Sequence, residues 1–293
     1  MSNGEVTSKL LPDAEDLPCW WTCTNEVHHG ATDRIGHSML DAFRESPRDY
    51  RVKYSGPRSR EPKGDALRLG SAAHDLAADP VAFLRDWFVL PEDVNLRTKA
   101  GRSVRDAAIT NRGDCYLTAG EFSDVRRWIE ALMRGRATGP LLRSPGVRER
   151  SLFWQDEETG LICKCRPDLW LEEARIVVDI KTSRNARPDW FRKEIEDRGY
   201  HRGAAWYLDG LAQVAGPEPI DYMFAVVGKD RLETAAYTLR AEDLAKARDQ
   251  NRRALVALAA CYESGDWTAQ FERQVTELSL AGHAFAVDDY ELL

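Results

Sequence analysis

The chain has 293 residues, of which 43% are hydrophobic and 9% aromatic, so it can bury the core of one large domain or two smaller ones. Its formal net charge of −7 argues against a protein that coats nucleic acid by bulk charge, although a local basic groove can coexist with an acidic exterior. No apolar run is long enough to cross a bilayer, and the polar N-terminus has no apolar signal region, so we expect a cytoplasmic protein without membrane association.

The expected domain organisation follows from where periodic patterns begin. Residues 1–30 have little periodicity, which predicts a mobile acidic tail, although Trp20 and Trp21 could dock on the body or on another subunit. Residues 31–293 are expected to form a single domain. Its parts are a mainly helical region (31–146), a sheet core (147–240), and a C-terminal helix and tail (241–293).

Helical patterns dominate the first part of this domain. Ser38 is a candidate N-cap of a first helix, and a second helix over Leu67–Pro80 carries His74 among alanines. A histidine in that position is most simply a core or surface residue. A short strand is expected at Trp87–Leu90, and the pattern after Ser123 predicts a longer helix with an apolar stripe that faces the core.

From Val147 the periodicity becomes that of strands. Three strands are predicted as a meander, at Ser151–Gln155, Ile162–Leu171 and Arg175–Ile180. Further elements are expected as helices at Trp190–Arg198 and Arg202–Val214, strands at Tyr222–Val227 and Glu233–Leu239, and a helix at Ala241–Ser264. This order predicts an α+β fold with one mixed sheet and helices on its faces.

Basic residues concentrate in two stretches, which are most simply solvated faces but could line a groove for nucleic acid. The first contains Arg44, Arg48, Arg51, Lys53, Arg58, Arg60, Lys63 and Arg68, with a Pro/Gly/Ser-rich basic loop at Ser55–Lys63, and the second contains Arg97, Lys99, Arg102 and Arg105.

The residues that carry chemistry gather in the central hairpin. Asp179 and Lys181 are two apart on a predicted strand, so both point to one face while Ile180 points to the other. If the hairpin folds back as predicted, Asp168 joins them. Two carboxylates and an ammonium that converge at a strand end favour divalent metal binding and phosphodiester hydrolysis.

Mg²⁺ prefers hard oxygen ligands in octahedral geometry. Asp168 and Asp179 supply carboxylate oxygens, the backbone carbonyl of Ile180 can supply another, and Glu149 is a plausible further ligand. Lys181 cannot bind a metal as an ammonium, so it would orient and help deprotonate the attacking water, or stabilise developing charge. His74 could contact a second metal or a phosphate.

A bare triplet of this kind is a weak signal, because strands often end in Asp and Lys, and a structural salt bridge is an equal alternative. Three details strengthen the functional interpretation. Pro167 directly precedes Asp168, the apolar run 176–178 leads into Asp179, and a helix with aromatic residues follows.

This block resembles the PD-(D/E)xK nuclease superfamily, and the wider chain from about Ile35 to Trp267 resembles the phage recombination exonucleases of the RecE type. The similar stretches are SMLDAFRESPRDY (38–50), LRLGSAAHDLAADP (67–80), NLRTKAG (95–101), ERSLFWQDEETGLICKCRPD (149–168), VVDIKTS (177–183) and GYHRGAAWYLDG (199–210). The resemblance implies a restriction-endonuclease-like core with a central mixed β-sheet flanked by helices.

The resemblance also implies an activity. Such proteins are Mg²⁺-dependent exodeoxyribonucleases, with Mn²⁺ as a possible substitute, that digest the 5′-ended strand of linear double-stranded DNA in the bacterial cytoplasm. They leave 3′ single strands for a single-strand annealing protein of the RecT type, and they form toroidal homo-oligomers, here a tetramer by resemblance. Arginines of the two basic stretches could line a pocket for the 5′ phosphate.

The resemblance also implies which residues of this chain are catalytic. His74, Asp168, Asp179 and Lys181 match the catalytic residues, and Glu149 fits the upstream acid. Thr182 and Ser183 follow the lysine as in relatives and could touch the phosphate.

One departure concerns the helix after the lysine strand. Relatives carry a glutamine four residues before a tyrosine, whereas Gly203 stands four residues before Tyr207. Arg202 or His201 could substitute for the glutamine. Tyr207 itself is a candidate supporting residue, with core packing as the alternative.

The six cysteines are scattered, and reduced thiols are expected. Cys19 and Cys23 have no second close pair that would complete a zinc site. Cys163 and Cys165 flank the metal strand but are expected to be structural, since Mg²⁺ avoids thiolates. Only Cys261 lies late in the chain, which argues against the iron–sulfur cluster of some related nucleases.

Two other functions remain open from the sequence alone. The chain could be a single-strand-specific or endonucleolytic PD-(D/E)xK nuclease of the CRISPR-associated type. It could also be a non-catalytic DNA-end-binding protein with a vestigial metal site, although the intact Asp168, Asp179 and Lys181 argue against that.

Overall fold

The computed structural model describes residues 11–54, 64–214, 219–269, 272–273, 275 and 277–279. The basic loop expected at Ser55–Lys63 therefore lies outside the described residues, together with Arg58, Arg60 and Lys63. Among the residues described, none of the helices is both long and apolar enough to span a bilayer.

A five-stranded mixed sheet forms the centre of the fold, which confirms the predicted α+β class. Its order is β10 (Thr234–Tyr237), β9 (Asp221–Gly228), β8 (Ile176–Ser183), β7 (Leu169–Leu171) and β4 (Val147–Arg148). β8 and β9 are parallel, whereas the other neighbours are antiparallel. A parallel pair needs a long crossover, and α9 (Pro188–Arg198) and α10 (Tyr200–Val214) supply it.

A second sheet corrects the predicted meander. Its three strands are β1 (Cys19–Trp21), β5 (Ser151–Gln155) and β6 (Ile162–Cys165), in the order β1–β5–β6. The strand predicted at Ile162–Leu171 is interrupted at residues 166–168, so Asp168 lies between β6 and β7 rather than within a strand. Its partner is interrupted at Glu149, between β4 and β5. The antiparallel pair thus passes from one sheet to the other at Glu149 and Asp168.

The N-terminal segment is not the free tail that its composition predicted. β1 pairs with β5, with Trp21 opposite Ser151, and α1 (Asn25–Gly30) follows with its N-terminus capped by Thr24. His28 is buried, and its Nδ1 lies 2.9 Å from the Ser151 hydroxyl. A preceding 3₁₀ turn covers Ala14–Asp16. Backbone pairing and this buried contact hold residues 11–30 on the body, while residues 1–10 lie outside the described part of the chain.

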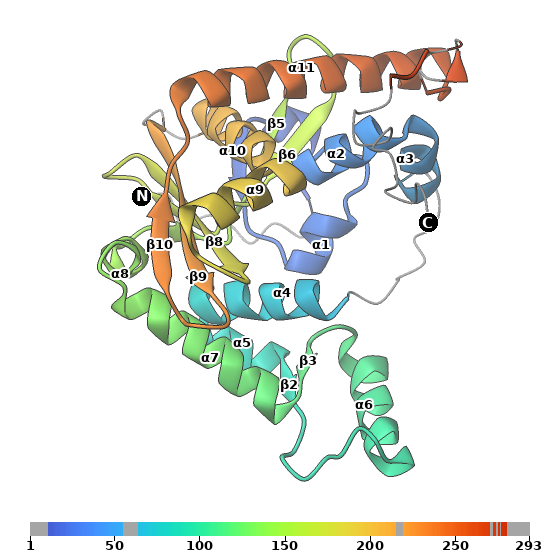
Figure 1. Ribbon diagram of the computed structural model, residues 1–293. Coiled ribbons are helices and arrows are strands. Elements are labelled where there is room, and N and C mark those ends of the chain that lie inside the picture. Colours follow the sequence, from blue (N-terminus) through green and yellow to red (C-terminus); the bar gives the residue numbers. More distant parts are fainter. Residues whose placement is uncertain are drawn as a thin grey trace, which may run out of the picture.

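Helices cover both faces of the central sheet (Figure 1). Because side chains alternate along a strand, Val177 of β8 faces a core shared with α2 (His37–Glu45), α9, α10 and α11 (Ala241–Ser264), and Val178 faces the other side. That second core includes α4 (Asp65–Ala78), α5 (Pro80–Asp86) and α7 (Ala119–Arg134). Two separate cores therefore pack on the opposite faces of β8.

Two helices begin before the residues that the sequence pattern predicted. α7 begins at Ala119 because Thr118 and Glu121 form a capping box ahead of Ser123. α4 begins at Asp65, two residues before the predicted Leu67, and a Cβ atom on its Gly70 would be 4.0 Å from the Thr182 hydroxyl. The remaining elements are α3 (Pro47–Tyr54), β2 (Phe88–Val89), α6 (Lys99–Arg112), β3 (Tyr116–Leu117) and α8 (Thr138–Arg143).

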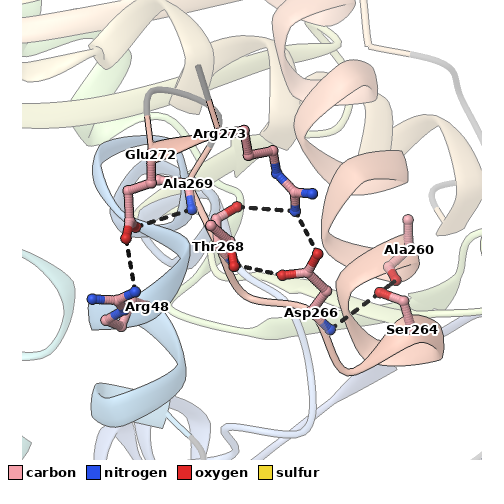
Figure 2. A network of polar contacts seen from close by, with 8 residues as sticks. All are labelled: Arg48, Ala260, Ser264, Asp266, Thr268, Ala269, Glu272 and Arg273. Carbon is pink, nitrogen blue, oxygen red and sulfur yellow. Dashed lines mark hydrogen bonds and ion pairs between the residues drawn. The ribbon is translucent and has the colours of Figure 1, made fainter. Parts of the chain in front are cut away.

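The chain after α11 returns to α3 through the polar network of Figure 2. Asp266 accepts hydrogen bonds from Thr268 and Arg273, and Arg48 of α3 donates to Glu272 at 2.7 Å. Trp267 also stacks on the Tyr50 ring. Arg48, from the first basic stretch, thus has a structural partner on the same chain.

Candidate active site

A histidine and two acids from distant parts of the sequence meet at the crossing between the sheets. One ligand atom each of His74, Glu149 and Asp168 lies within 4.8 Å of the others. The small residues Ala72 and Ala73, both fully buried, let α4 approach the sheet closely. His74 Nδ1 then lies 3.0 Å from Asp168 Oδ1.

Both oxygens of Asp168 have a defined partner. Oδ1 faces His74, and Oδ2 accepts a hydrogen bond from the backbone N–H of Ile180 at 2.7 Å. Burial disfavours the charged form, but the nearby His74 and Lys181 hold the pKa of Asp168 below its usual value. Burial likewise opposes protonation of His74, yet Asp168 outweighs it and raises the pKa of His74 to about 9. The carboxylate is therefore fixed in place and ionised.

Asp179 and Lys181 form an ion pair on the adjacent strand β8. Burial raises the pKa of Asp179, whereas for Lys181 the effect of burial is outweighed by Asp179, which raises the pKa of the ammonium. Oδ2 of Asp179 is buried and, among the described residues, has no hydrogen-bond partner of regular geometry besides this ion pair. Lys181 Nζ also lies 5.0 Å from the centre of the Tyr200 ring.

Glu149 has an unusual backbone for a residue with a side chain. Its φ of 45° lies in the left-handed region, which non-glycine residues rarely adopt. Arg166 Nε donates to the Glu149 carbonyl at 2.8 Å and lies 3.3 Å from Oε2 of its carboxylate. Burial first, and then the nearby Asp168, raise the pKa of Glu149 to about 8. A cation between these acids would relieve that cost.

The three candidate supporting residues, Thr182, Ser183 and Tyr207, lie in different surroundings. Ser183 is buried, and its hydroxyl donates to the Asn185 carbonyl at 2.8 Å, so it closes a turn. Thr182 faces α4 near Gly70. Tyr207 packs its ring 6.1 Å from that of Tyr222. Burial first, and then the nearby Asp179, raise the pKa of the Tyr222 hydroxyl. Tyr222 is not predicted from the sequence, because it lies in a continuous apolar strand and has no local signal.

Gly203 has a physical explanation in the packing of α2 against α10. A Cβ atom on Gly203 would lie 3.3 Å from Cδ2 and 3.4 Å from Nε2 of His37. The His37 ring also lies edge-on to Tyr207, with 5.5 Å between ring centres. Arg202 instead donates to Asp41 at 2.7 Å. Neither of the two residues expected to replace the glutamine lies beside Gly203. His201 Nδ1 lies 3.2 Å from the Ile195 carbonyl. The side chain beside Gly203 is that of His37.

Replacing Gly203 with glutamine is expected to lower the free energy of unfolding by about 1–3 kcal/mol, because the new side chain overpacks against His37. Combining it with His37→Ala should recover part of that loss, with a coupling of roughly 0.5–3 kcal/mol in a denaturant-unfolding double-mutant cycle. Gly120→Gln is the matched control, since Gly120 is exposed on α7 with open space around it. Equal stability of the two glutamine variants would contradict the contact.

The residues present fit a hard divalent cation. They offer carboxylate oxygens and one imidazole, and the buried Oδ2 of Asp179 has unused acceptor capacity. Cys163 and Cys165 are buried in the core, and burial raises the pKa of both thiols, so neither presents a thiolate to the site. The backbone N–H of Ile180 donates a hydrogen bond to Asp168, so the backbone of Ile180 is held against this candidate metal ligand.

One solved structure shares this architecture over most of both chains. A crystal structure of a proposed exonuclease from Eubacterium rectale has a TM-score of 0.56 at 14% identity, and the match covers 91% of this chain and 98% of that one. A phage-related exonuclease from Haemophilus somnus 129PT has a TM-score of 0.30 at 13% identity, covering 80% of this chain and 96% of that one. A search of curated proteins gives no significant match.

The family described as "PDDEXK-like domain of unknown function (DUF3799)" matches residues 36–274, which include every residue of the candidate site. With its mixed sheet, its paired acids and the lysine on β8, the chain belongs to this PDDEXK-like family.

Proposed function

We propose that the protein is a metal-dependent nuclease that hydrolyses phosphodiester bonds of DNA. The convergence of His74, Glu149 and Asp168, beside the Asp179–Lys181 pair, carries this proposal. A structural salt bridge would account for the pair on β8. It would not account for a left-handed glutamate and a histidine from α4 that meet at the same carboxylate.

Each residue of the site has a role that its surroundings favour. A bound divalent cation would acidify a water molecule and neutralise charge on the phosphate. Asp168 and Asp179 would hold it, with Glu149, His74 and the Ile180 carbonyl as further candidate ligands.

Lys181 has a raised pKa and is therefore protonated at neutral pH, so its Nζ–H groups are suited to orient the water and to stabilise negative charge on the phosphate. The Asp179 carboxylate keeps the ammonium in place beside the metal site.

The finer function is that of an exodeoxyribonuclease of the RecE type. It would digest the 5′-ended strand of linear double-stranded DNA in the cytoplasm of a bacterial host, leaving 3′ overhangs for strand annealing by a protein of the RecT type. The motif order in residues 35–267 and the fold shared with the proposed exonuclease of Eubacterium rectale support this choice. A toroidal homotetramer around the duplex would make digestion processive.

The test is to incubate the purified protein with Mg²⁺ and three substrates: linear duplex, covalently closed circular duplex and single-stranded DNA. We expect loss of the linear duplex only, with 5′-labelled strands shortened and 3′-labelled strands retained. Equal cutting of linear and circular duplex would overturn the exonuclease proposal in favour of an endonuclease. No cutting of any substrate would overturn the nuclease proposal itself. Sedimentation tests the ring separately, since a monomer at working concentration excludes it.

A further inference from the structure

Arg166 is a largely buried arginine that lies beside the candidate metal site and is not one of the proposed ligands. It lies where the chain crosses from β6 to β7, and its side chain is 10% exposed. Its Nε donates to the Glu149 carbonyl at 2.8 Å and lies 3.3 Å from the Glu149 carboxylate. Its Nη2 donates to the Cys23 carbonyl at 2.8 Å. One guanidinium therefore joins Glu149 to the N-terminal segment.

Glu149 needs such a contact to keep its conformation. A left-handed φ on a residue with a side chain persists only where the surroundings over-determine it. The backbone pairing at this point is weak, since the Glu149 N–H reaches the Asp168 carbonyl only at 3.3 Å. Arg166 contacts both the backbone carbonyl and the side-chain carboxylate of Glu149. These two contacts fix the direction in which the Glu149 side chain leaves the backbone.

A purely stabilising role explains Arg166 poorly. Its Nη1 is buried and has no hydrogen-bond partner in the described part of the chain, which is costly for a group of this kind. The arrangement instead holds the Glu149 carboxylate within reach of Asp168 and His74.

We propose that Arg166 is a positioning residue that holds Glu149 in its metal-binding orientation and anchors it, through the Cys23 carbonyl, to the segment that carries β1 and α1. The proposal rests on the proposed function only for the identity of the metal site. Lysine at this position would keep the charge but lose the planar fork that reaches three acceptors at once.

The test compares Arg166→Lys with Arg68→Lys. Arg68 is a matched control, because its side chain is 4% exposed, pairs with Glu121 and donates to the Tyr116 carbonyl at 2.8 Å, without contact to a candidate ligand. Mn²⁺ binding to each protein alone is measured by electron paramagnetic resonance, with thermal unfolding alongside. Groups that orient metal ligands contribute about 10–100-fold to affinity, so we expect Arg166→Lys to weaken Mn²⁺ binding by about tenfold or more. Arg68→Lys should bind as the wild type does.

A kinetic measurement separates positioning from catalysis. For Arg166→Lys, the Mg²⁺ concentration at half-maximal hydrolysis should rise, while kcat returns to near the wild-type value at saturating Mg²⁺. If Arg166→Lys does not fold, Arg166→Gln, which can still donate to one carbonyl, takes its place. Wild-type Mn²⁺ affinity in either folded variant would overturn the proposal, and so would equal weakening in Arg68→Lys. A wild-type protein that binds Mn²⁺ but cuts no DNA would overturn the proposed function and leave this inference standing.

Discussion

Replacing Lys181 with alanine is expected to lower the rate of DNA hydrolysis by roughly 10²–10³-fold or more, the size of effect seen when a group that stabilises transition-state charge is removed. The ammonium is the cation beside Asp179 in this site, and no carboxylate can supply its hydrogen-bond donors. DNA binding should persist, because Lys181 lies within the site rather than at the surface: its side chain is 19% exposed.

Hydrolysis of a labelled linear duplex in Mg²⁺ and binding in its absence are the two measurements for this variant. Lys246→Ala is the control, since that lysine is 75% exposed on α11 and pairs with Asp243 at 3.8 Å. Because loss of the ammonium leaves Asp179 buried without its ion-pair partner, Lys181→Gln is examined beside it to separate chemistry from stability. A fully active Lys181→Ala protein would remove Lys181 from the mechanism.

Replacing Asp168 with asparagine is expected to abolish metal binding and hydrolysis while preserving the fold. The amide oxygen can still accept the hydrogen bond from Ile180, but the charge that faces His74 and the metal is lost. The loss of metal affinity should exceed the roughly 10–100-fold that outer contacts contribute. Asp189→Asn is the control, because Asp189 is 90% exposed on α9.

The same substitution has a spectroscopic signature. In the metal-free wild type, Asp168 raises the pKa of His74 to about 9 against the effect of burial. Without that carboxylate, burial dominates, so the pKa of His74 should fall well below 9 in an NMR titration of the imidazole. An unchanged titration would show that Asp168 is not the group that charges His74.

The parts of the fold predicted correctly are those with a long periodic pattern. α11 has the predicted bounds, and β8 and β9 follow from apolar runs that are buried on both faces. The crossing between the sheets was missed because alternation of side chains looks the same on either sheet. The N-terminal strand β1 was missed because a three-residue strand is too short to show alternation, and its stability comes from pairing with β5.

The candidate site likewise contains residues that local spacing predicts and residues that it does not. The spacing of Asp179 and Lys181 places both on one face of a strand by local geometry alone. His74 and Glu149 were named from the sequence as candidate ligands without a spacing signal, and the resemblance placed them in the catalytic set. Arg166 and His37 were missed altogether. Each acts through contacts with residues distant in the sequence, Arg166 on Glu149 and His37 on Gly203, and such contacts leave no period in the sequence. The position of Arg166 directly before Pro167-Asp168 was the one available hint for it.

We propose that a divalent cation binds where the two sheets exchange strands, beside Lys181. Anomalous diffraction from crystals grown with Mn²⁺ would locate this cation. We expect an anomalous peak at the carboxylates of Asp168 and Asp179, in contact with Glu149 or His74, and loss of that peak in Asp168→Asn. A peak elsewhere, with none at Asp168 in crystals of a protein that cuts DNA in Mn²⁺, would contradict this proposal.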